Sequence, residues 1–156
     1  MLKISRRASA VISLVLTVML LVIIVAGAVA MPWLADLMIG MPYNPNRADI
    51  TPGERAFIIT VAYLALASAA AADIAVFFLL RSVLAGQVFT DRVVALLRLI
   101  SWCCFAFALM FVLIVYYFAL AAVVAFCAVF VGICLRVVKN AFAEAVAIKN
   151  ENDFTI

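Results

Sequence analysis

Asp73 is the residue with the clearest chemical potential, because it is an ionisable side chain placed well inside a long apolar run. If that run crosses a bilayer, a carboxylate there costs about 2.5–3.5 kcal/mol on insertion scales and therefore faces protein rather than lipid. Hydroxyl side chains recur every four residues on the preceding apolar run, and an arginine further along the chain could extend its side chain toward them. The sequence thus predicts an intramembrane polar cluster: Asp73, Ser13, Thr17 and Arg98.

Three roles are open for this cluster. It could join helices through hydrogen bonds, each worth about 0.6–2 kcal/mol in a membrane. It could instead relay protons or ions, or face a partner protein. A single acid without a second intramembrane acid or a histidine makes a weak relay, whereas the alanine-rich run 65–72 beside it favours close helix packing.

Little else in the chain offers catalytic chemistry. The absence of histidine excludes histidine-based acid–base catalysis and metal sites that use histidine. Four cysteines lie inside apolar runs, where thiols behave as small hydrophobic groups, with metal or redox chemistry as the alternative: Cys103, Cys104, Cys127 and Cys134. Without paired acids or a nucleophile motif, we expect a non-enzymatic protein with no catalytic, cofactor-binding or metal-binding residues.

The composition explains why these side chains must be positioned by membrane helices. Hydrophobic residues make up 71% of the 156 residues and charged residues only 12%, against about 45–50% and about 25% in soluble domains. A helix needs about 20 apolar residues to cross a bilayer. Four runs meet this need approximately, at residues 8–31, 56–80, 99–117 and 120–135.

The last two runs nearly merge, so the connection between them has to be inferred. A single helix over residues 99–135 would measure about 55 Å, whereas the hydrocarbon layer is about 30 Å thick. The chain must therefore turn back, and Tyr116 and Tyr117 mark the turn because tyrosine prefers the interface. The predicted fold is all-α: one membrane domain over residues 1–156, an antiparallel bundle of four transmembrane helices.

Helix ends and close contacts also leave local signals. Residues 51–54, Thr-Pro-Gly-Glu, predict a capping box with proline at the first helical position. Thr90 is expected to cap the next helix. Small residues form a stripe on the last run, which indicates internal packing or, alternatively, a homo-oligomer interface: Ala121, Ala125, Ala128 and Gly132.

The distribution of lysine and arginine predicts the orientation. Nine of these residues precede the first run, separate the second from the third, or follow the fourth, and only Arg47 and Arg55 lie in the other connections. The positive-inside rule places both termini in the cytoplasm, with an outer loop at 37–55, a cytoplasmic loop at 82–98 and a cytoplasmic tail at 136–156. The alternative is that the first run is a cleaved secretory signal, since an Ala-x-Ala site occurs at 28–30.

Two segments resemble a known family. Residues 86–101 read GQVFTDRVVALLRLIS, and the chain ends in ENDFTI. Both are similar to the loop signature and the acidic terminus of the YoaS-like family of small membrane proteins of unknown function. The resemblance implies a multi-pass protein of the bacterial inner (cytoplasmic) membrane, often encoded beside a small helix-turn-helix transcription regulator.

These segments predict a cytoplasmic partner surface. Its expected members are Gly86, Phe89, Thr90, Arg98, Asp153, Phe154, Thr155 and Ile156. The tail could pack against the loop or be read by a protein partner. The leading hypothesis is binding or sequestration of the regulator, without direct binding of nucleic acid by this chain. The alternative is a small transporter, channel or immunity protein that uses Asp73 in an oligomeric pathway.

Overall fold

The computed structural model describes residues 6–40 and 50–153, with side chains described for 11–40, 50–149 and 151. Four helices fill these residues: α1 (Arg6–Ile39), α2 (Pro52–Leu84), α3 (Asp91–Leu113) and α4 (Leu120–Asp153). Each is long and apolar enough to cross a membrane. The predicted all-helical fold with four candidate membrane spans is therefore confirmed.

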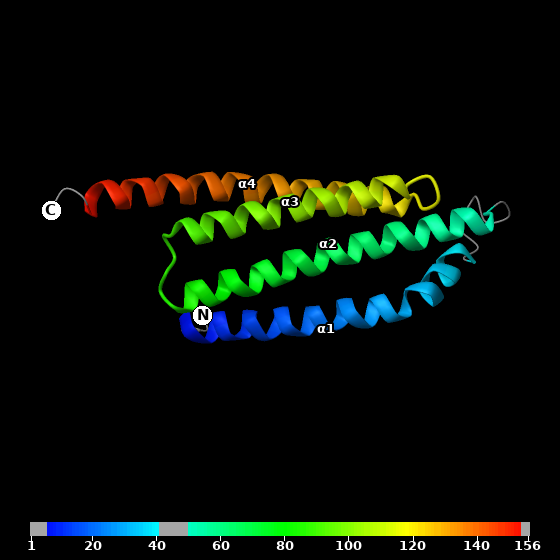
Figure 1. Ribbon diagram of the computed structural model, residues 1–156, viewed down its shortest axis with the longest axis horizontal. Helices are drawn as coiled ribbons and strands as arrows, with labels where there is room; N and C mark the ends of the chain where they lie inside the picture. The colour runs from blue at the N-terminus through cyan, green and yellow to red at the C-terminus, as the bar shows by residue number, and fades with distance from the viewer. Residues whose placement is uncertain (1–5, 41–49, 154–156) are drawn as a thin grey trace, which may run out of the picture.

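The helices run antiparallel in a row, in chain order (Figure 1). Within the described residues α1 packs on α2, α2 on α3 and α3 on α4, and no direct packing joins α1 to α4. The row is thus open along one side. The beginning of α1, the α2–α3 connection and the end of α4 lie at the same end (Figure 1), which we call the terminal end.

The start of α2 confirms the predicted capping box. The Thr51 backbone N–H donates to Glu54 Oε2 at 2.7 Å, and the Glu54 N–H donates to Thr51 Oγ1 at 3.3 Å. At α3, Thr90 occupies the cap position, but its side chain makes no capping hydrogen bond. Its backbone carbonyl instead accepts the N–H groups of Val93 and Val94.

The end of α2 turns sharply because of one glycine. Gly86 has φ of 76°, in the left-handed region that favours glycine. Its N–H donates to the Val83 carbonyl, and the Gln87 N–H donates to the Ser82 carbonyl, both at 3.0 Å. This is the Schellman arrangement, which satisfies helix-end carbonyls and directs the chain toward α3.

The helices outrun the predicted spans at several ends. Most of the predicted loop 82–98 is helical, leaving only 85–90 between α2 and α3. The third helix ends at Leu113 instead of 117, so Tyr116 and Tyr117 lie in the turn, where they were expected. The predicted tail is helical up to Asp153. Backbone hydrogen bonding needs no apolar side chains, so a helix can continue where lipid contact ends.

The closest packing joins α3 to α4. Ser101, only 3% exposed, donates its hydroxyl to the Gly132 carbonyl at 2.8 Å. A Cβ added at Gly132 would lie 3.0 Å from the Phe105 ring and 3.3 Å from the Cys104 Cβ. Ala121 and Ala125 are also buried on α4, whose described packing partner is α3. The small-residue stripe therefore serves internal packing at these positions.

A proline bends α1 without leaving a carbonyl unpaired. Pro32 lies inside the helix, which curves over its second half (Figure 1). Proline has no N–H for the carbonyl four residues earlier, which here belongs to Ala28. The Tyr63 hydroxyl of α2 donates to that carbonyl at 3.1 Å. The hydrogen bond compensates for the proline and joins α1 to α2, as a lipid environment requires.

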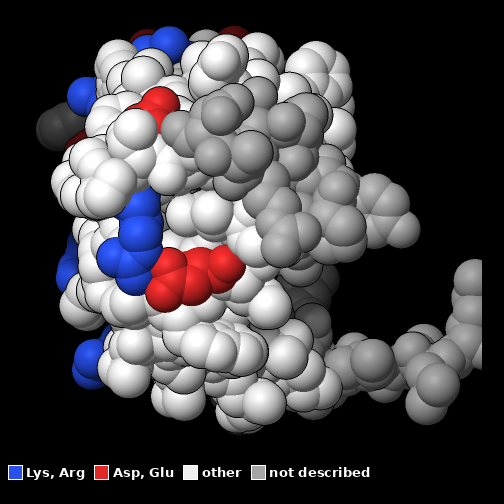
Figure 2. Space-filling model, turned by 90° about the vertical axis from the view of Figure 1, so that its right-hand side faces the viewer, with Lys and Arg blue, Asp and Glu red and all other residues white. Residues whose placement is uncertain are grey.

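Polar contacts join neighbouring elements at the end of the molecule opposite the terminal end. Arg55 at the start of α2 donates two hydrogen bonds to the Asp36 carboxylate of α1, at 2.6 and 2.9 Å. Figure 2 looks onto this end and shows basic and acidic groups in contact on a largely uncharged surface. The Tyr117 hydroxyl donates to Glu54 Oε1 at 3.3 Å. Desolvation, together with the nearby Glu54 carboxylate, raises the pKa of Tyr117 and keeps the phenol protonated.

Candidate functional site

The open side of the helix row contains a groove, which we call the α1–α4 groove. Its main cavity measures about 540 Å³ and is lined by residues of all four helices. One wall comes from α1 and the opposite wall from α4: Thr17, Leu20 and Ile24, then Cys127, Ala128 and Val131. A second apolar cavity of about 320 Å³ continues toward the other end and shares Val124 with the first. The groove is therefore an apolar surface open between α1 and α4.

Asp73 lies in this groove. It is 6% exposed and makes no hydrogen bond or ion pair with any residue that the structure describes. Thr17, 9% exposed, lines the same cavity, but its hydroxyl donates to the Leu14 carbonyl at 2.8 Å. Ser68 likewise donates to the Ala65 carbonyl at 2.7 Å. The two hydroxyl protons are thus engaged within their own helices, while the oxygens can still accept hydrogen bonds.

The structure brings together only part of the predicted polar cluster. Asp73 and Thr17 share the cavity, whereas Ser13 and Arg98 do not line it. Ser13 is half-buried on α1, and Arg98 is exposed on α3. The buried Ser101 hydroxyl of α3 donates to the Gly132 carbonyl of α4.

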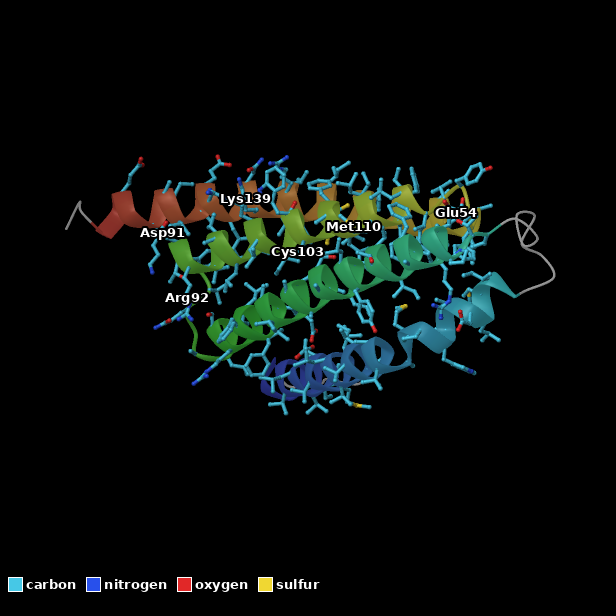
Figure 3. All side chains as sticks on the ribbon, turned by 45° about the vertical axis from the view of Figure 1, so that its right-hand side comes forward. Glu54, Asp91, Arg92, Cys103, Met110 and Lys139 are labelled. Carbon is cyan, nitrogen blue, oxygen red and sulfur yellow. The ribbon has the colours of Figure 1, made fainter. Side chains whose placement is uncertain are left out.

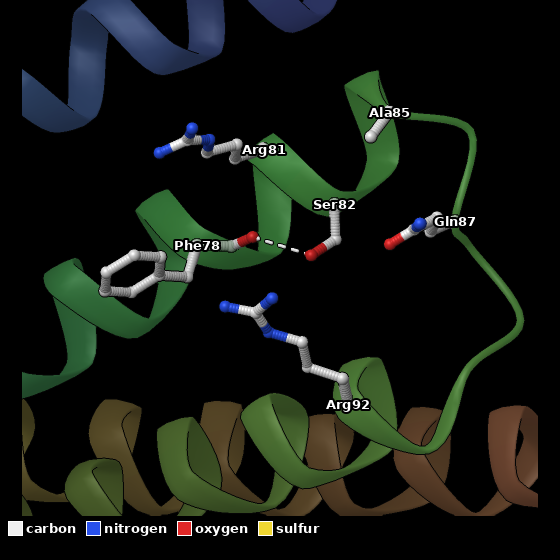
Figure 4. Close-up of a pocket in the computed structure, with 6 residues that line it drawn as sticks. All are labelled: Phe78, Arg81, Ser82, Ala85, Gln87 and Arg92. Atoms are coloured by element: carbon white, nitrogen blue, oxygen red, sulfur yellow. Dashed lines mark hydrogen bonds between the residues drawn. The ribbon is translucent and has the colours of Figure 1, made fainter.

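A separate cavity, outside the α1–α4 groove, lies at the terminal end beside the α2–α3 connection. It measures about 370 Å³ and is lined by Phe78, Arg81, Ser82, Ala85, Gln87 and Arg92. Figure 4 shows the Arg92 side chain reaching from α3 toward α2, where the Ser82 hydroxyl donates to the Phe78 carbonyl. Neither arginine forms an ion pair with a described residue. The cavity is therefore a basic pocket without an acidic partner among these residues.

Beside this pocket, the loop is attached to α4. The Phe89 ring stacks on Phe142 with ring centroids 6.0 Å apart, although Phe89 remains 49% exposed. One turn beyond Phe142, Val146 is only 5% exposed. The end of α4 projects past the start of α3 (Figure 1). Loop and helix extension thus meet at the terminal end in a surface that we call the terminal face: Arg81, Gly86, Phe89, Thr90, Arg92 and Phe142.

Charged side chains labelled in Figure 3 lie near both ends of the molecule. Asp91 and Arg92 lie near the terminal end, Glu54 at the opposite end, and Cys103 between them (Figure 3). Of the predicted partner surface, Gly86, Phe89 and Thr90 belong to the terminal face. Asp153 is the last residue of α4. Phe154, Thr155 and Ile156 lie outside the described residues.

Sequence reasoning missed the roles of four residues: Phe142, Arg81, Arg92 and Tyr63. Phe142 is a partner of Phe89 that helical spacing alone does not reveal. Arg81 and Arg92 were counted for topology, but their shared pocket depends on how Gly86 turns the chain. Pro32 leaves one carbonyl that needs a donor, but that Tyr63 of α2 supplies it depends on how α1 and α2 pack.

The comparisons with known proteins place most of the chain in one group. Residues 43–156 match the family described as "Protein of unknown function (DUF2975)". No curated protein and no solved structure matches the chain. The match covers α2, α3 and α4 completely, and the YoaS-like name stays a prediction.

Proposed function

The chain belongs to the DUF2975 family, and from this premise we propose that it is a non-enzymatic membrane protein whose terminal face binds a small helix-turn-helix transcription regulator. It would hold the regulator at the bacterial inner membrane, with both termini in the cytoplasm, and release it in response to an envelope signal. The observation that carries the proposal is the contact between Phe89 and Phe142, because it makes one surface of the loop and the α4 extension.

The chemistry of the terminal face suits a protein partner. Aromatic and arginine side chains dominate the binding energy of many protein interfaces. Here the half-exposed Phe89 lies in the α2–α3 connection, between Arg81 in the last turn of α2 and Arg92 in the first turn of α3. Neither arginine has an acidic partner among the described residues. Such a face favours a partner surface with acidic and apolar side chains. Since DNA-binding surfaces are basic, we expect the regulator to dock through a face other than its DNA-binding one.

Binding to the full chain in lipid nanodiscs tests the proposal. A helix-turn-helix regulator encoded beside this protein, as the YoaS-like resemblance implies, is expected to bind these nanodiscs and not empty ones. Phe89→Ala should weaken binding at least tenfold, because it removes the exposed aromatic group of the terminal face. Tyr116→Ala is the matched control: Tyr116 is 74% exposed, but it lies in the α3–α4 turn at the opposite end.

A second measurement in cells makes the proposal falsifiable. Deleting residues 151–156 or introducing Phe89→Ala should change the transcripts that the regulator controls, while the protein remains in the membrane. If the regulator binds wild-type and Phe89→Ala nanodiscs equally, and neither variant changes a transcript, the proposal is wrong.

A second candidate function is favoured by the α1–α4 groove. A small transporter, channel or immunity protein could use Asp73 in a pathway formed by several copies of the chain, since Asp73 faces a cavity lined by all four helices. Reconstituted liposomes should then show a solute or proton flux that Asp73→Asn abolishes. Absence of flux from wild-type liposomes would exclude this candidate.

A further inference from the structure

We infer that the α1–α4 groove is a binding site for a lipophilic amine, whose protonated nitrogen pairs with Asp73 and whose apolar body fills the cavity. This inference rests on the groove alone. It holds whether or not the terminal face binds a regulator.

The first argument is the state of Asp73. Its side chain is buried, lines the cavity and has no partner among the described residues. Buried polar groups are normally hydrogen-bonded, and one without a partner points to a missing ligand or ion. The nearby Thr17 and Ser68 oxygens also line the cavity as acceptors, because their protons are donated within their own helices. The site therefore lacks a donor.

The second argument is charge complementarity. Among the residues that the structure describes, Asp73 is the only ionisable acid or base that lines the cavity, apart from the weakly acidic cysteine thiols. The apolar runs 8–31, 56–80 and 99–135 contain no lysine or arginine, so a second copy of the chain would bring no cation to this depth. The cation that complements the carboxylate must therefore come from another molecule.

Depth and size define the class of that molecule. Asp73 lies eight residues before Arg81, the first charged residue that follows it on α2, which is about 12 Å along the helix. A lipid head group stays near the interface, so the amine must itself be lipophilic. A volume of about 540 Å³ lies within the roughly 300–1,000 Å³ of small-molecule pockets, which are mostly apolar with a few placed polar groups. The open side between α1 and α4 allows entry from the bilayer.

Equilibrium dialysis with two matched probes tests the inference. The probes are a tertiary amine with a naphthylpropyl group and the alcohol with the same group, followed by naphthyl fluorescence. The full chain is held in phosphatidylcholine nanodiscs, and binding to empty nanodiscs is subtracted. We expect saturable binding of the amine that is at least tenfold tighter than binding of the alcohol.

Two groove variants test the contributions of the carboxylate and of the cavity separately. Asp73→Asn keeps the side-chain size and should weaken amine binding at least tenfold, whereas Asp91→Asn makes the same change at an exposed position outside the groove and should not. Ala128→Phe should block binding from the α4 wall with Asp73 intact. If Asp73→Asn misfolds, the inference is still tested in two ways. Ala128→Phe tests the cavity, and the comparison of the two probes on wild-type protein tests the charge.

Several outcomes would overturn the inference. Equal binding of amine and alcohol would show that the charge on the amine does not contribute to binding. Unchanged binding by folded Asp73→Asn or Ala128→Phe would place the amine elsewhere. Competition by phosphatidylethanolamine would assign the site to a lipid head group. Crosslinking between the Cys127 thiols of two copies, with loss of probe binding, would assign the groove to a second copy.

Discussion

Pro32 and Tyr63 form a compensating pair at the level of single residues. Tyr63→Phe removes the donor to the Ala28 carbonyl, and Pro32 cannot supply one. We therefore predict that Tyr63→Phe lowers the free energy of unfolding by about 0.6–2 kcal/mol, the range for hydrogen bonds between membrane helices. Unfolding in mixed micelles with increasing dodecyl sulfate measures this change.

A double-mutant cycle provides the control for this pair. In a Pro32→Ala background the residue 32 N–H becomes available to the Ala28 carbonyl, so Tyr63→Phe should cost clearly less. Equal costs in both backgrounds would show that the tyrosine and the proline are not coupled.

Gly132 offers a second prediction at this scale. Because a Cβ there already approaches the Phe105 ring at 3.0 Å, Gly132→Leu should overpack the α3–α4 contact. We expect a destabilisation of about 1–3 kcal/mol in the same unfolding assay. Gly27→Leu is the matched control, since no atom lies within 4 Å of an added Cβ at Gly27. Equal effects of the two substitutions would contradict this account.

The contacts of a residue can be predicted from the sequence when its partners are close to it in the chain. The Thr51 capping box involves neighbours in the chain, and it was predicted correctly. Asp73 is buried as its chemistry requires. The donor to Ala28 could not be derived, because the rotation of α2 that brings Tyr63 to α1 depends on packing along its whole length.

At the level of elements, the stacking of Phe89 on Phe142 should hold the α2–α3 connection on α4. Phe142→Ala removes this contact, and such aromatic pairs contribute about 0.5–1.5 kcal/mol beyond buried area. We predict faster amide hydrogen exchange in residues 85–90 and 142–149. Phe130→Ala is the control, because Phe130 lies on the same helix and is 61% exposed; similar exchange in both variants would rule out the role of the stack.

Element lengths were predictable only in part. The turn near Tyr116 followed from comparing one long apolar run with the bilayer thickness, and the structure has it there. The end of the α4 extension was harder to predict. Hydropathy indicates which residues contact lipid, but it does not indicate where a helix ends once the chain has left the bilayer. Its end at Asp153 depends on backbone hydrogen bonds that polar residues such as Lys139 and Glu144 sustain equally well.

At the scale of the whole molecule, the open row of helices could not be read from the sequence. Each span is apolar around most of its circumference, and lipid competes with neighbouring helices for the same apolar faces. Exposure reflects this, since Val22 is 63% and Val29 81% exposed on α1. Apolar patterning therefore specifies four spans without specifying whether α1 meets α4, and the groove that holds Asp73 becomes visible only in three dimensions.

The orientation of the whole molecule is the remaining prediction. Four antiparallel helices place the start of α1 and the end of α4 at the same end (Figure 1), so both termini share one side of the membrane if all four helices cross it. Nine of the eleven lysines and arginines belong to that side of the chain, so the positive-inside rule predicts that this side is cytoplasmic.

Reporter fusions to the full chain measure this orientation. Alkaline phosphatase fused after Ile156 should be inactive, and a green fluorescent protein at the same position should fluoresce. Phosphatase inserted within residues 41–49 should be active, because the end of α1 and the start of α2, which this segment joins in the sequence, lie at the opposite end from the α2–α3 loop. The reverse pattern would put the terminal face outside the cytoplasm and exclude a transcription regulator as its partner, while the amine site in the groove would be unaffected, since entry from the bilayer does not depend on which end faces inward.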